Sequence, residues 1–286
     1  MEEYYFIFYL ALIWTGFAAI QDLRTREVAN WLSFSLITFS LAYRMFYSAI
    51  FNNWNFFLFG LVGFGAFYLV ALTFYYGGIF GGGDAKLLMG IGTLLPVVNL
   101  SNTIFYLGGF IFLLFLFGSV YSLAYSVFLV GKNREQFKAS FFTCMKKYKS
   151  LLISSIFVLA ILSIFLSFYL SIYFTIFFSI LFLATPFLFI YLRALEESCM
   201  IKLIAPKNLS VGDWLAKNVF VRNRWIKKSA HGLSIEDIRT LRRARKKVMI
   251  KEGIPFVPAF FISLSIMGFA AAILGLDLSR VIYYLF

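Results

Sequence analysis

The sequence predicts an all-α integral membrane protein with about eight transmembrane helices and a small cytosolic segment containing α and β structure before the last helix. Of the 286 residues, 62% are hydrophobic and only 14% are charged, whereas soluble domains are roughly 25% charged. Apolar runs long enough to cross the hydrocarbon core, which takes about 20 residues, recur along the chain. These runs cover residues 4–21, 30–51, 56–79, 84–98, 103–130, 150–168, 171–193 and 257–276.

The apolar runs also divide the chain into five parts. The sixth and seventh runs are nearly continuous, so a count of seven helices stays open. The first run starts almost at Met1 and leads into a polar loop, which is typical of a membrane anchor rather than a cleaved signal. The expected parts are a membrane core with helices one to five at 1–130, a basic cytosolic loop at 131–149, helices six and seven at 150–193, a basic cytosolic segment at 194–254, and the last membrane helix with its tail at 255–286.

The basic residues predict the orientation of the chain, because Lys and Arg favour the cytosolic side of a membrane. With the N-terminus outside, all but two of the 26 basic residues fall in cytosolic segments, and the exceptions are Arg44 and Arg280. The formal net charge of +13 is therefore mainly an orientation signal. Attraction to anionic lipid follows as a side effect, and the charge does not indicate binding to nucleic acid.

The cytosolic segment at 194–254 is the only sizeable soluble part. Its first half has the composition of one or two strands and a turn. Ser234 and Asp237 form a capping box that predicts the start of a helix near 235–250. We expect the apolar face of this helix to lie on anionic lipid headgroups, and a docking surface for a protein partner is the alternative. The apolar face consists of Ile235, Ile238, Leu241 and Val248.

Most kinds of catalytic site are excluded by the residues that the chain lacks. It has two cysteines, Cys144 and Cys199, and one histidine, His231. These three residues form no metal-ligand cluster and no Cys/His or Ser/His pair. We therefore expect no metal and no cofactor, and carboxylates remain as the catalytic candidates.

Two aspartates are placed at the same membrane face by the predicted topology. Asp22 lies where the first helix leaves the membrane, and Asp84 lies where the fourth helix begins, after Gly81, Gly82 and Gly83. The fourth run, from Asp84 to Val98, is about 22 Å long at 1.5 Å per residue, shorter than the hydrocarbon core of about 30 Å. The glycine loop should therefore dip into the membrane, where irregular backbone lines a cavity or is buried in protein. Ionisable residues at that depth are candidates for function.

Two neighbouring carboxylates can hydrolyse a peptide bond without a covalent intermediate. They share one proton, because two like charges at short range are costly. The ionised carboxylate takes a proton from water, and the protonated one donates to the peptide carbonyl. Simpler interpretations also stand. Asp84 is a suitable N-cap for the fourth helix, and Asp22 is an ordinary interfacial charge beside Arg24 and Arg26.

The stretch "GGGD" at 81–84 fits a G-x-G-D signature, and it continues as "GDAKLL". This motif resembles that of the membrane-embedded aspartyl proteases, and in particular of the type IV prepilin and preflagellin peptidases. The stretch "QDLRTREVANW" at 21–31 is similar to their first-aspartate loop. The stretches "LSVGDWL", "HGLSIEDIRTL" and "KKVMIKEGIPFVPAFFISL" resemble the C-terminal region of archaeal members. The resemblance covers residues 20–31, 77–96 and most of 200–265.

The resemblance implies a leader peptidase in the cell membrane. Such an enzyme removes the short basic leader of type IV prepilin-like or archaellin precursors at the cytosolic face. Asp22 and Asp84 match the two catalytic aspartates, and Gly81, Gly82 and Gly83 match the active-site loop. Lys86 matches a basic position that would contact substrate or support the site, although a lysine at the cytosolic end of a helix is also ordinary. The implied partners are such precursors and anionic lipid, and nucleic acid is not among them.

The chain departs from the pattern of two related groups of enzymes. The chain lacks the two CxxC pairs that bacterial prepilin peptidases often carry, so we expect peptidase activity without N-methyltransferase activity. Gln21 precedes Asp22, and "PFVPAF" is not a PAL motif, which argues against presenilin-type proteases.

Two functions other than a peptidase are the alternatives. An ion- or proton-coupled transporter would need polar residues deep in several helices. A non-catalytic assembly scaffold would leave both aspartates dispensable.

Overall fold

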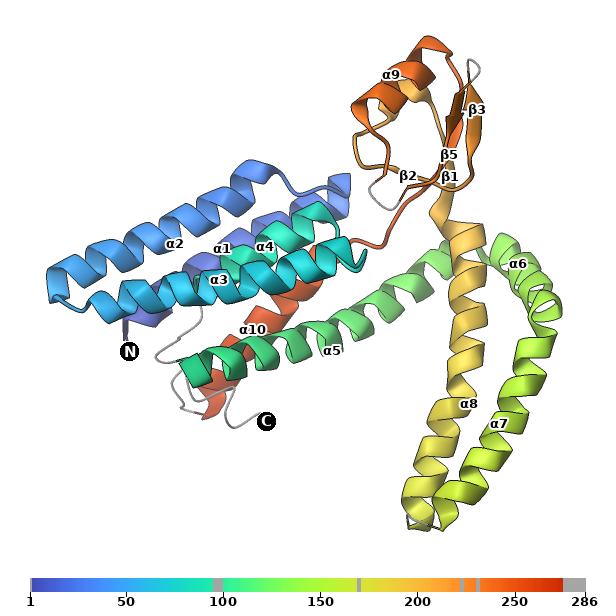
Figure 1. Cartoon of the computed structure of the whole chain (residues 1–286), viewed down its shortest axis with the longest axis horizontal. Helices are drawn as coiled ribbons and strands as arrows, with labels where there is room; N and C mark the ends of the chain where they lie inside the picture. The colour runs from blue at the N-terminus through green and yellow to red at the C-terminus, as the bar shows by residue number, and fades with distance from the viewer. Residues whose placement is uncertain (1, 95–99, 169–170, 222–223, 230–231, 275–286) are drawn as a thin grey trace. The chain divides into compact units, whose positions relative to one another are not determined.

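The computed structural model describes residues 2–94, 100–168, 171–221, 224–229 and 232–274 (Figure 1). The chain forms two compact units, each of which is described by itself. Unit 1 comprises residues 1–124 and 254–286, and unit 2 comprises residues 125–253. Helices dominate both units among the described residues, as the sequence predicts for an all-α membrane protein.

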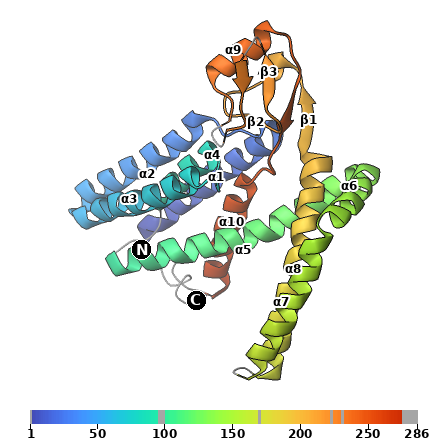
Figure 2. The same cartoon turned by 45° about the vertical axis from the view of Figure 1, so that its right-hand side comes forward.

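Unit 1 is a helical bundle with one apolar core. Helix α4 packs against both α2 and α3, while α1 packs against α2 and α10 (Figures 1 and 2). Ile7, Leu36, Phe67, Leu88 and Phe260 are almost completely buried and belong to the same core cluster. The helices of this unit are α1 (Glu2–Thr25), α2 (Asn30–Phe51), α3 (Trp54–Tyr76), α4 (Gly82–Gly92), the first part of α5 (Leu100–Lys132) and α10 (Val257–Leu274).

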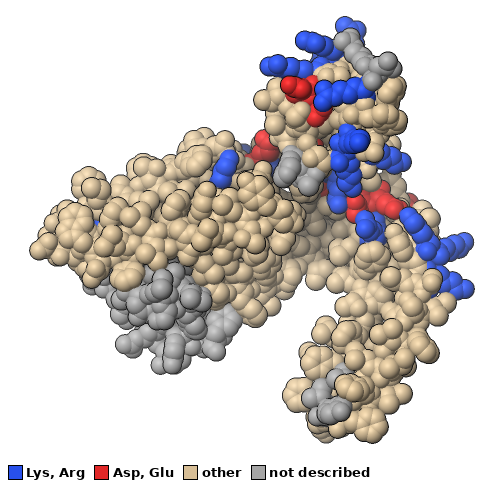
Figure 3. All heavy atoms as spheres, in the orientation of Figure 1, with Lys and Arg blue, Asp and Glu red and all other residues tan. Residues whose placement is uncertain are grey.

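Unit 2 combines a helical part with a small sheet. In the sheet, β5 lies between β1 and β2 and is antiparallel to both, and β3 pairs with β4 as a separate hairpin. Lys and Arg side chains gather over this unit (Figure 3). Its elements are the end of α5, α6 (Arg134–Lys147), α7 (Lys149–Ser167), α8 (Ile172–Leu195), the π-helix η1 (Glu196–Met200), β1 (Ile201–Ile204), the 3₁₀-helix η2 (Pro206–Asn208), β2 (Trp214–Leu215), β3 (Val219–Val221), β4 (Arg224–Ile226), α9 (Ile235–Arg243) and β5 (Val248–Lys251).

Helix α6 replaces most of the loop expected at 131–149. Phe137, Phe141 and Cys144 recur at intervals of four and three residues, which places them on one helix face. That face packs with Ile190 and Ala194 of α8 in a separate apolar cluster. The basic side chains occupy the other faces, and because of them the sequence was interpreted as a loop.

Helix α9 starts as predicted but ends earlier than the expected range of 235–250. Both hydrogen bonds of the Ser234–Asp237 capping box are present, at 3.2 Å each. After Arg243 the chain turns through Arg245, whose φ is 51°, and continues into β5. Val248 therefore belongs to a central strand rather than to the helix, because the sequence from Val248 alternates between buried and exposed residues.

The expected contact between the apolar face of α9 and lipid is wrong. Ile238 and Leu241 are 5% and 0% exposed and belong to the core of the small sheet domain. Ile235 alone of the four predicted face residues is exposed, at 57%. The helix is amphipathic because it covers a sheet, and the sequence pattern of a helix on a sheet matches that of a helix on a membrane.

Five helices of the described chain are long and apolar enough to cross a membrane, namely α1, α2, α3, α5 and α8. A sixth span results if α6 and α7, which meet at 62°, count as one broken span. Helix α4 has 11 residues and is about 16 Å long, so it does not reach across the bilayer. The expected fourth helix at 84–98 ends at Gly92, and its last residues, 95–98, lie outside the described part. The count of eight spans stays a prediction.

Candidate active site

Asp22 is a buried carboxylate in the last turn of α1, with 6% of its surface exposed. Its Oδ2 accepts a hydrogen bond of 3.1 Å from the backbone N–H of Val257. Val257 is the first residue of α10, and the first N–H groups of a helix have no partner inside the helix. The Asp22 side chain therefore caps α10 across 235 residues of sequence. This is more than the interfacial charge that the simpler interpretation offered.

The loop from α1 to α2 is folded back close to Asp22. Arg26 adopts a left-handed conformation with φ of 60°, and its N–H donates to the backbone oxygen of Asp22 at 2.9 Å. The Gln21 side chain accepts from the N–H of Ala29 at 3.1 Å, which fixes the start of α2. The Arg26 charge also attracts the Asp22 carboxylate. The stretch "QDLRTREVAN" is thus a compact turn built around one acid.

Asp84 is the third residue of α4, and Gly81 occupies the N-cap position. The Asp84 Oδ2 accepts from the Gly81 N–H at 3.2 Å, which is one half of a capping box. The interpretation of Asp84 as the N-cap residue is therefore wrong by three positions. The carboxylate still favours the positive end of the helix dipole. This contact orients the side chain at the start of α4.

Glycines allow the start of α4 to approach the loop that follows Asp22. A Cβ added to Gly83 would lie 3.3 Å from the Val28 Cβ and 3.6 Å from the Val28 backbone nitrogen. By contrast, a Cβ on Gly82 would meet only the Tyr75 ring, at an ordinary 3.8 Å. Earlier in the loop, Gly78 has a φ of +68°, which favours glycine. The third glycine of the motif therefore sits where two segments of backbone meet.

The two aspartates are brought close enough for their negative charges to repel each other. One comes from the end of α1 and the other from the start of α4. The structure thus brings together the two carboxylates that the sequence singled out. Each of them is held by a backbone N–H through Oδ2.

Lys86 lies against the start of α2. Its Nζ donates to the Asn30 Oδ1 at 2.6 Å and lies 5.8 Å from the centre of the Phe34 ring. These contacts connect α4 to α2 two residues after Asp84. The role expected for Lys86 in the site stays a prediction.

Two structural features of unit 1 were not predicted from the sequence. The first is the bond between Asp22 and α10, for which the only signal was Pro258 in the first turn of a helix. The second is Arg44, which the predicted topology placed toward the outside. Arg44 is fully buried in unit 1. A lone basic residue within an apolar run was the signal for it.

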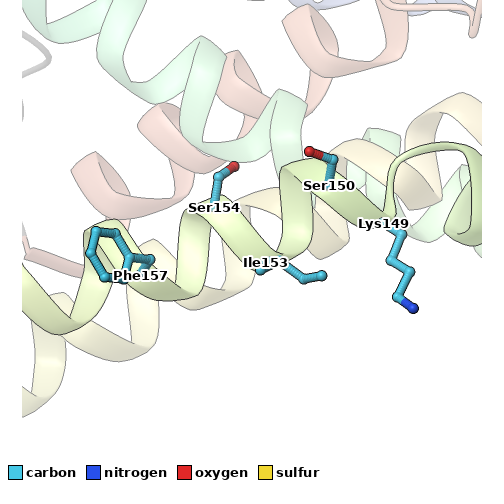
Figure 4. A pocket seen from close by; sticks show the side chains of 5 residues that line it. All are labelled: Lys149, Ser150, Ile153, Ser154 and Phe157. Atoms are coloured by element: carbon cyan, nitrogen blue, oxygen red, sulfur yellow. The ribbon is translucent and has the colours of Figure 1, made fainter.

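A pocket on α7 of unit 2 offers no comparable chemistry (Figure 4). Its lining residues all come from one exposed stretch of a single helix. The only ionisable side chain among them is that of Lys149. The residues that line the pocket are Lys149, Ser150, Ile153, Ser154 and Phe157.

Comparison with known proteins matches the part of the chain that contains both aspartates. Residues 9–127 match the family model described as the type IV leader peptidase family. This match confirms the resemblance to prepilin and preflagellin peptidases that the motifs predicted.

Two curated relatives are preflagellin peptidases of methanogenic archaea. The one from Methanocaldococcus jannaschii is 34% identical over 83 residues, which is 29% of this chain and 35% of the relative. The one from Methanococcus maripaludis is 29% identical over 79 residues, which is 28% of this chain and 34% of the relative. The alignments thus span about a third of each relative. No solved structure matches the chain.

Proposed function

We propose that the protein, whose residues 9–127 match the type IV leader peptidase family, is an aspartic endopeptidase of the GxGD class in the cell membrane. It removes the short basic leader from type IV prepilin-like or archaellin precursors. The observation that carries the proposal is the approach of Asp22 and Asp84, whose charges repel each other although they lie 62 residues apart in the sequence. Repelling carboxylates cost free energy, and catalysis is a reason to keep them together.

The proposed mechanism needs only the two carboxylates and a water molecule. The pair binds one proton between them, because two negative charges at this range are unfavourable. The ionised carboxylate takes a proton from the water, whose oxygen attacks the carbonyl carbon of the scissile peptide bond. The protonated carboxylate donates its proton to the carbonyl oxygen. Collapse of the tetrahedral intermediate breaks the C–N bond, and the nitrogen takes the proton that the base holds. One hydroxyl of the intermediate gives its proton to the other carboxylate, which forms the product carbonyl and restores the starting protonation of the pair.

The hydrogen bonds that hold the two carboxylates in place support proton transfer between them and the water. Asp22 is held by the N–H of Val257, and Asp84 by the N–H of Gly81. Because both donors are backbone groups at helix starts, neither carboxylate needs to reorganise while the proton moves.

The proposed substrate is a precursor with a basic leader followed by an apolar segment. Asp22, Asp84 and Glu27 supply negative charge at the end of α1 and the start of α4, which attracts a basic leader. Arg24, Arg26 and Lys86 in the same segments repel it, so recognition also uses backbone and apolar contacts. The names of the two relatives support archaellin-like precursors as the first class to test. We place the site at the cytosolic membrane face, with anionic lipid as a further partner, and we propose no nucleic-acid partner.

The test is the identification of the cleavage product. Membranes that contain the protein are incubated with an archaellin-like precursor, and the new N-terminus is determined by mass spectrometry. We expect one product that begins directly before the apolar segment, and none in membranes without the protein. A precursor whose leader lysines and arginines are replaced by glutamine should be cleaved more slowly. Intact precursor at the end of the incubation would contradict the proposal and favour a scaffold or a transporter.

A further inference from the structure

Arg44 is a buried cation in the interior of unit 1, with 0% of its surface exposed. Its Nε donates to the backbone oxygen of Thr93 at 2.7 Å, and its Nη1 donates to the backbone oxygen of Phe56 at 2.7 Å. The guanidinium carbon also lies 4.5 Å from the centre of the Phe56 ring, which attracts a cation. One side chain of α2 thus holds the end of α4 and the beginning of α3.

Thr93 is the C-cap residue of α4, the helix whose first turn carries Asp84. The last carbonyls of a helix have no donor inside the helix and form the negative end of its dipole. The buried Arg44 guanidinium supplies both a hydrogen-bond donor for these carbonyls and a positive charge at the negative end of the dipole. The Thr93 hydroxyl is held as well, by Ser40 one turn before Arg44 on α2 and by the Gly90 backbone oxygen at 2.6 Å.

Glycines on the neighbouring helices make room for this arrangement. A Cβ on Gly60 of α3 would clash with the Arg44 side chain at its Cδ. A Cβ on Gly92 would lie 2.6 Å from the Gly63 backbone oxygen and 2.6 Å from the Phe67 Cβ. The C-terminal end of α4 is thus packed directly against α3 and hydrogen-bonded to α2.

We propose that Arg44 is a positioning residue of the active site, which fixes the end of α4 and thereby the place of Asp84 beside Asp22. This inference rests on the proposed function. Between Asp84 and Thr93 the helix rises by about 14 Å, so this short rod carries a displacement at one end to the other. Arg44 touches neither substrate nor the reacting carboxylates in this role. It acts through the backbone of α4.

The structure supplies perturbing variants and matched controls. Arg44→Met keeps most of the volume and removes the guanidinium that donates to the Thr93 and Phe56 backbone oxygens. Arg44→Lys keeps the charge but lacks the planar fork that reaches two carbonyls. Gly60→Ala keeps Arg44 but pushes its side chain away. The controls are Ser48→Ala and Gly65→Ala.

Both control substitutions should leave the contacts of Arg44 unchanged. Ser48 lies one turn after Arg44 on the buried side of α2, and its hydroxyl makes no hydrogen bond within the described residues. A Cβ on Gly65 of α3 would meet nothing within 4 Å. Each control therefore changes the same helix as a test variant without touching the contacts of Arg44.

The kinetic readout separates positioning from general stability. Purified variants in the same lipid are compared at equal amounts of folded protein, with kcat, KM and the pH–rate profile measured on one precursor. For Arg44→Met and Gly60→Ala we expect kcat to fall about 10- to 100-fold with KM little changed, because displaced catalytic groups act mainly on the chemical step. The two limbs of the pH–rate profile should move toward each other, because separated carboxylates interact less. Arg44→Lys should fall between wild type and Arg44→Met.

An infrared titration gives a readout that does not need cleavage. The carboxylic C=O band of the pair is assigned by its loss in Asp84→Asn, and its two titration steps are followed against pH. The steps should be closer together in Arg44→Met and Gly60→Ala than in wild type, and unchanged in the controls. If wild type cleaves no precursor, the proposed function fails, but this titration still tests whether Arg44 sets the approach of the aspartates.

Two results would overturn the proposal. One is a folded Arg44→Met with the kcat and the titration of wild type. The other is activity lost only in proportion to folded protein, with an unchanged pH profile and titration, which would make Arg44 a stabilising residue alone. If Arg44→Met does not insert, Arg44→Lys and Gly60→Ala decide by the same readouts.

Discussion

At the scale of single residues, the Asp22 carboxylate has a structural task and, in the proposed mechanism, a chemical one. It caps the first turn of α10 through Val257, and it lies close to Asp84. An asparagine retains an oxygen for the cap but cannot act as an acid or a base. An alanine loses both tasks. The two tasks can therefore be separated by the choice of substitution.

We predict that Asp22→Ala is less stable than Asp22→Asn although neither cleaves. Loss of a helix cap costs about 0.5–2 kcal/mol, and the asparagine side chain keeps an acceptor for the Val257 N–H. The measurement is thermal unfolding of both purified variants in the same detergent. Equal unfolding temperatures would show that the Asp22–Val257 hydrogen bond does not stabilise α10.

A second residue-scale prediction concerns Asp213 in the small sheet domain. Burial raises the pKa of this carboxyl, and the neighbouring Glu252 charge raises it further, although the Ser210 N–H opposes the shift. A carboxyl whose folded pKa is raised contributes stability at low pH, and that contribution is lost as the pH rises through the folded pKa. Asp213→Asn should therefore leave the sheet more stable near neutral pH, and less dependent on pH as the pH rises above the ordinary aspartate pKa of about 3.9.

Amide hydrogen exchange of β1, β2 and β5 as a function of pH measures this effect in the intact protein. Wild type should exchange faster at about pH 7 than at about pH 4 after correction for intrinsic rates, and Asp213→Asn should not. Identical pH dependence in both proteins would contradict the prediction. Cleavage should be unaffected, since Asp213 belongs to unit 2 and the aspartate pair to unit 1.

At the scale of elements, the start of α4 depends on the contact between Gly83 and the loop after α1. We predict that Gly83→Ala lowers cleavage about tenfold or more, because its Cβ would press on Val28 and displace Asp84. Gly65→Ala is the control and should cleave at nearly the wild-type rate, because its Cβ would meet nothing within 4 Å. The measurement is the initial rate of precursor cleavage at equal protein. Similar rates for the two variants would remove Gly83 from the packing of the site.

The elements also show what sequence patterns can and cannot predict. The helix expected at 30–51 coincides with α2, because a mainly apolar run and the asparagines at its end define it locally. The helix at Arg134–Lys147 and the early end of α9 were missed. Both depend on partners that are distant in sequence, α8 in one case and the strands that pair with β5 in the other.

The same division holds for the candidate site. The motifs predicted Asp22, Asp84 and the glycine loop, and the structure brings the two aspartates together. The sequence did not reveal that Asp22 caps α10 or that Arg44 holds the end of α4. Those bonds join residues 235 and 49 positions apart, and no local pattern encodes them.

At the scale of the whole molecule, the charge distribution predicts one orientation in the membrane. The segment at 194–254 carries most of the basic side chains seen on unit 2 (Figure 3). We predict that trypsin cuts this segment in inside-out vesicles and not in intact cells, because Lys and Arg segments stay cytosolic. Mass spectrometry of the fragments is the measurement. Cleavage of the segment from the outside of intact cells would reverse the topology and with it the cytosolic placement of both aspartates.

The central claim is that Asp22 and Asp84 together hydrolyse the leader peptide bond. The most direct measurement compares precursor cleavage by wild type, Asp22→Asn, Asp84→Asn and the control Asp213→Asn, at equal amounts of inserted protein in the same lipid. We expect each of the first two substitutions alone to lower the rate by about 10³-fold or more, since residues that act as a unit fail as a unit, while Asp213→Asn cleaves normally. Normal cleavage by either Asp22→Asn or Asp84→Asn would contradict the two-carboxylate mechanism.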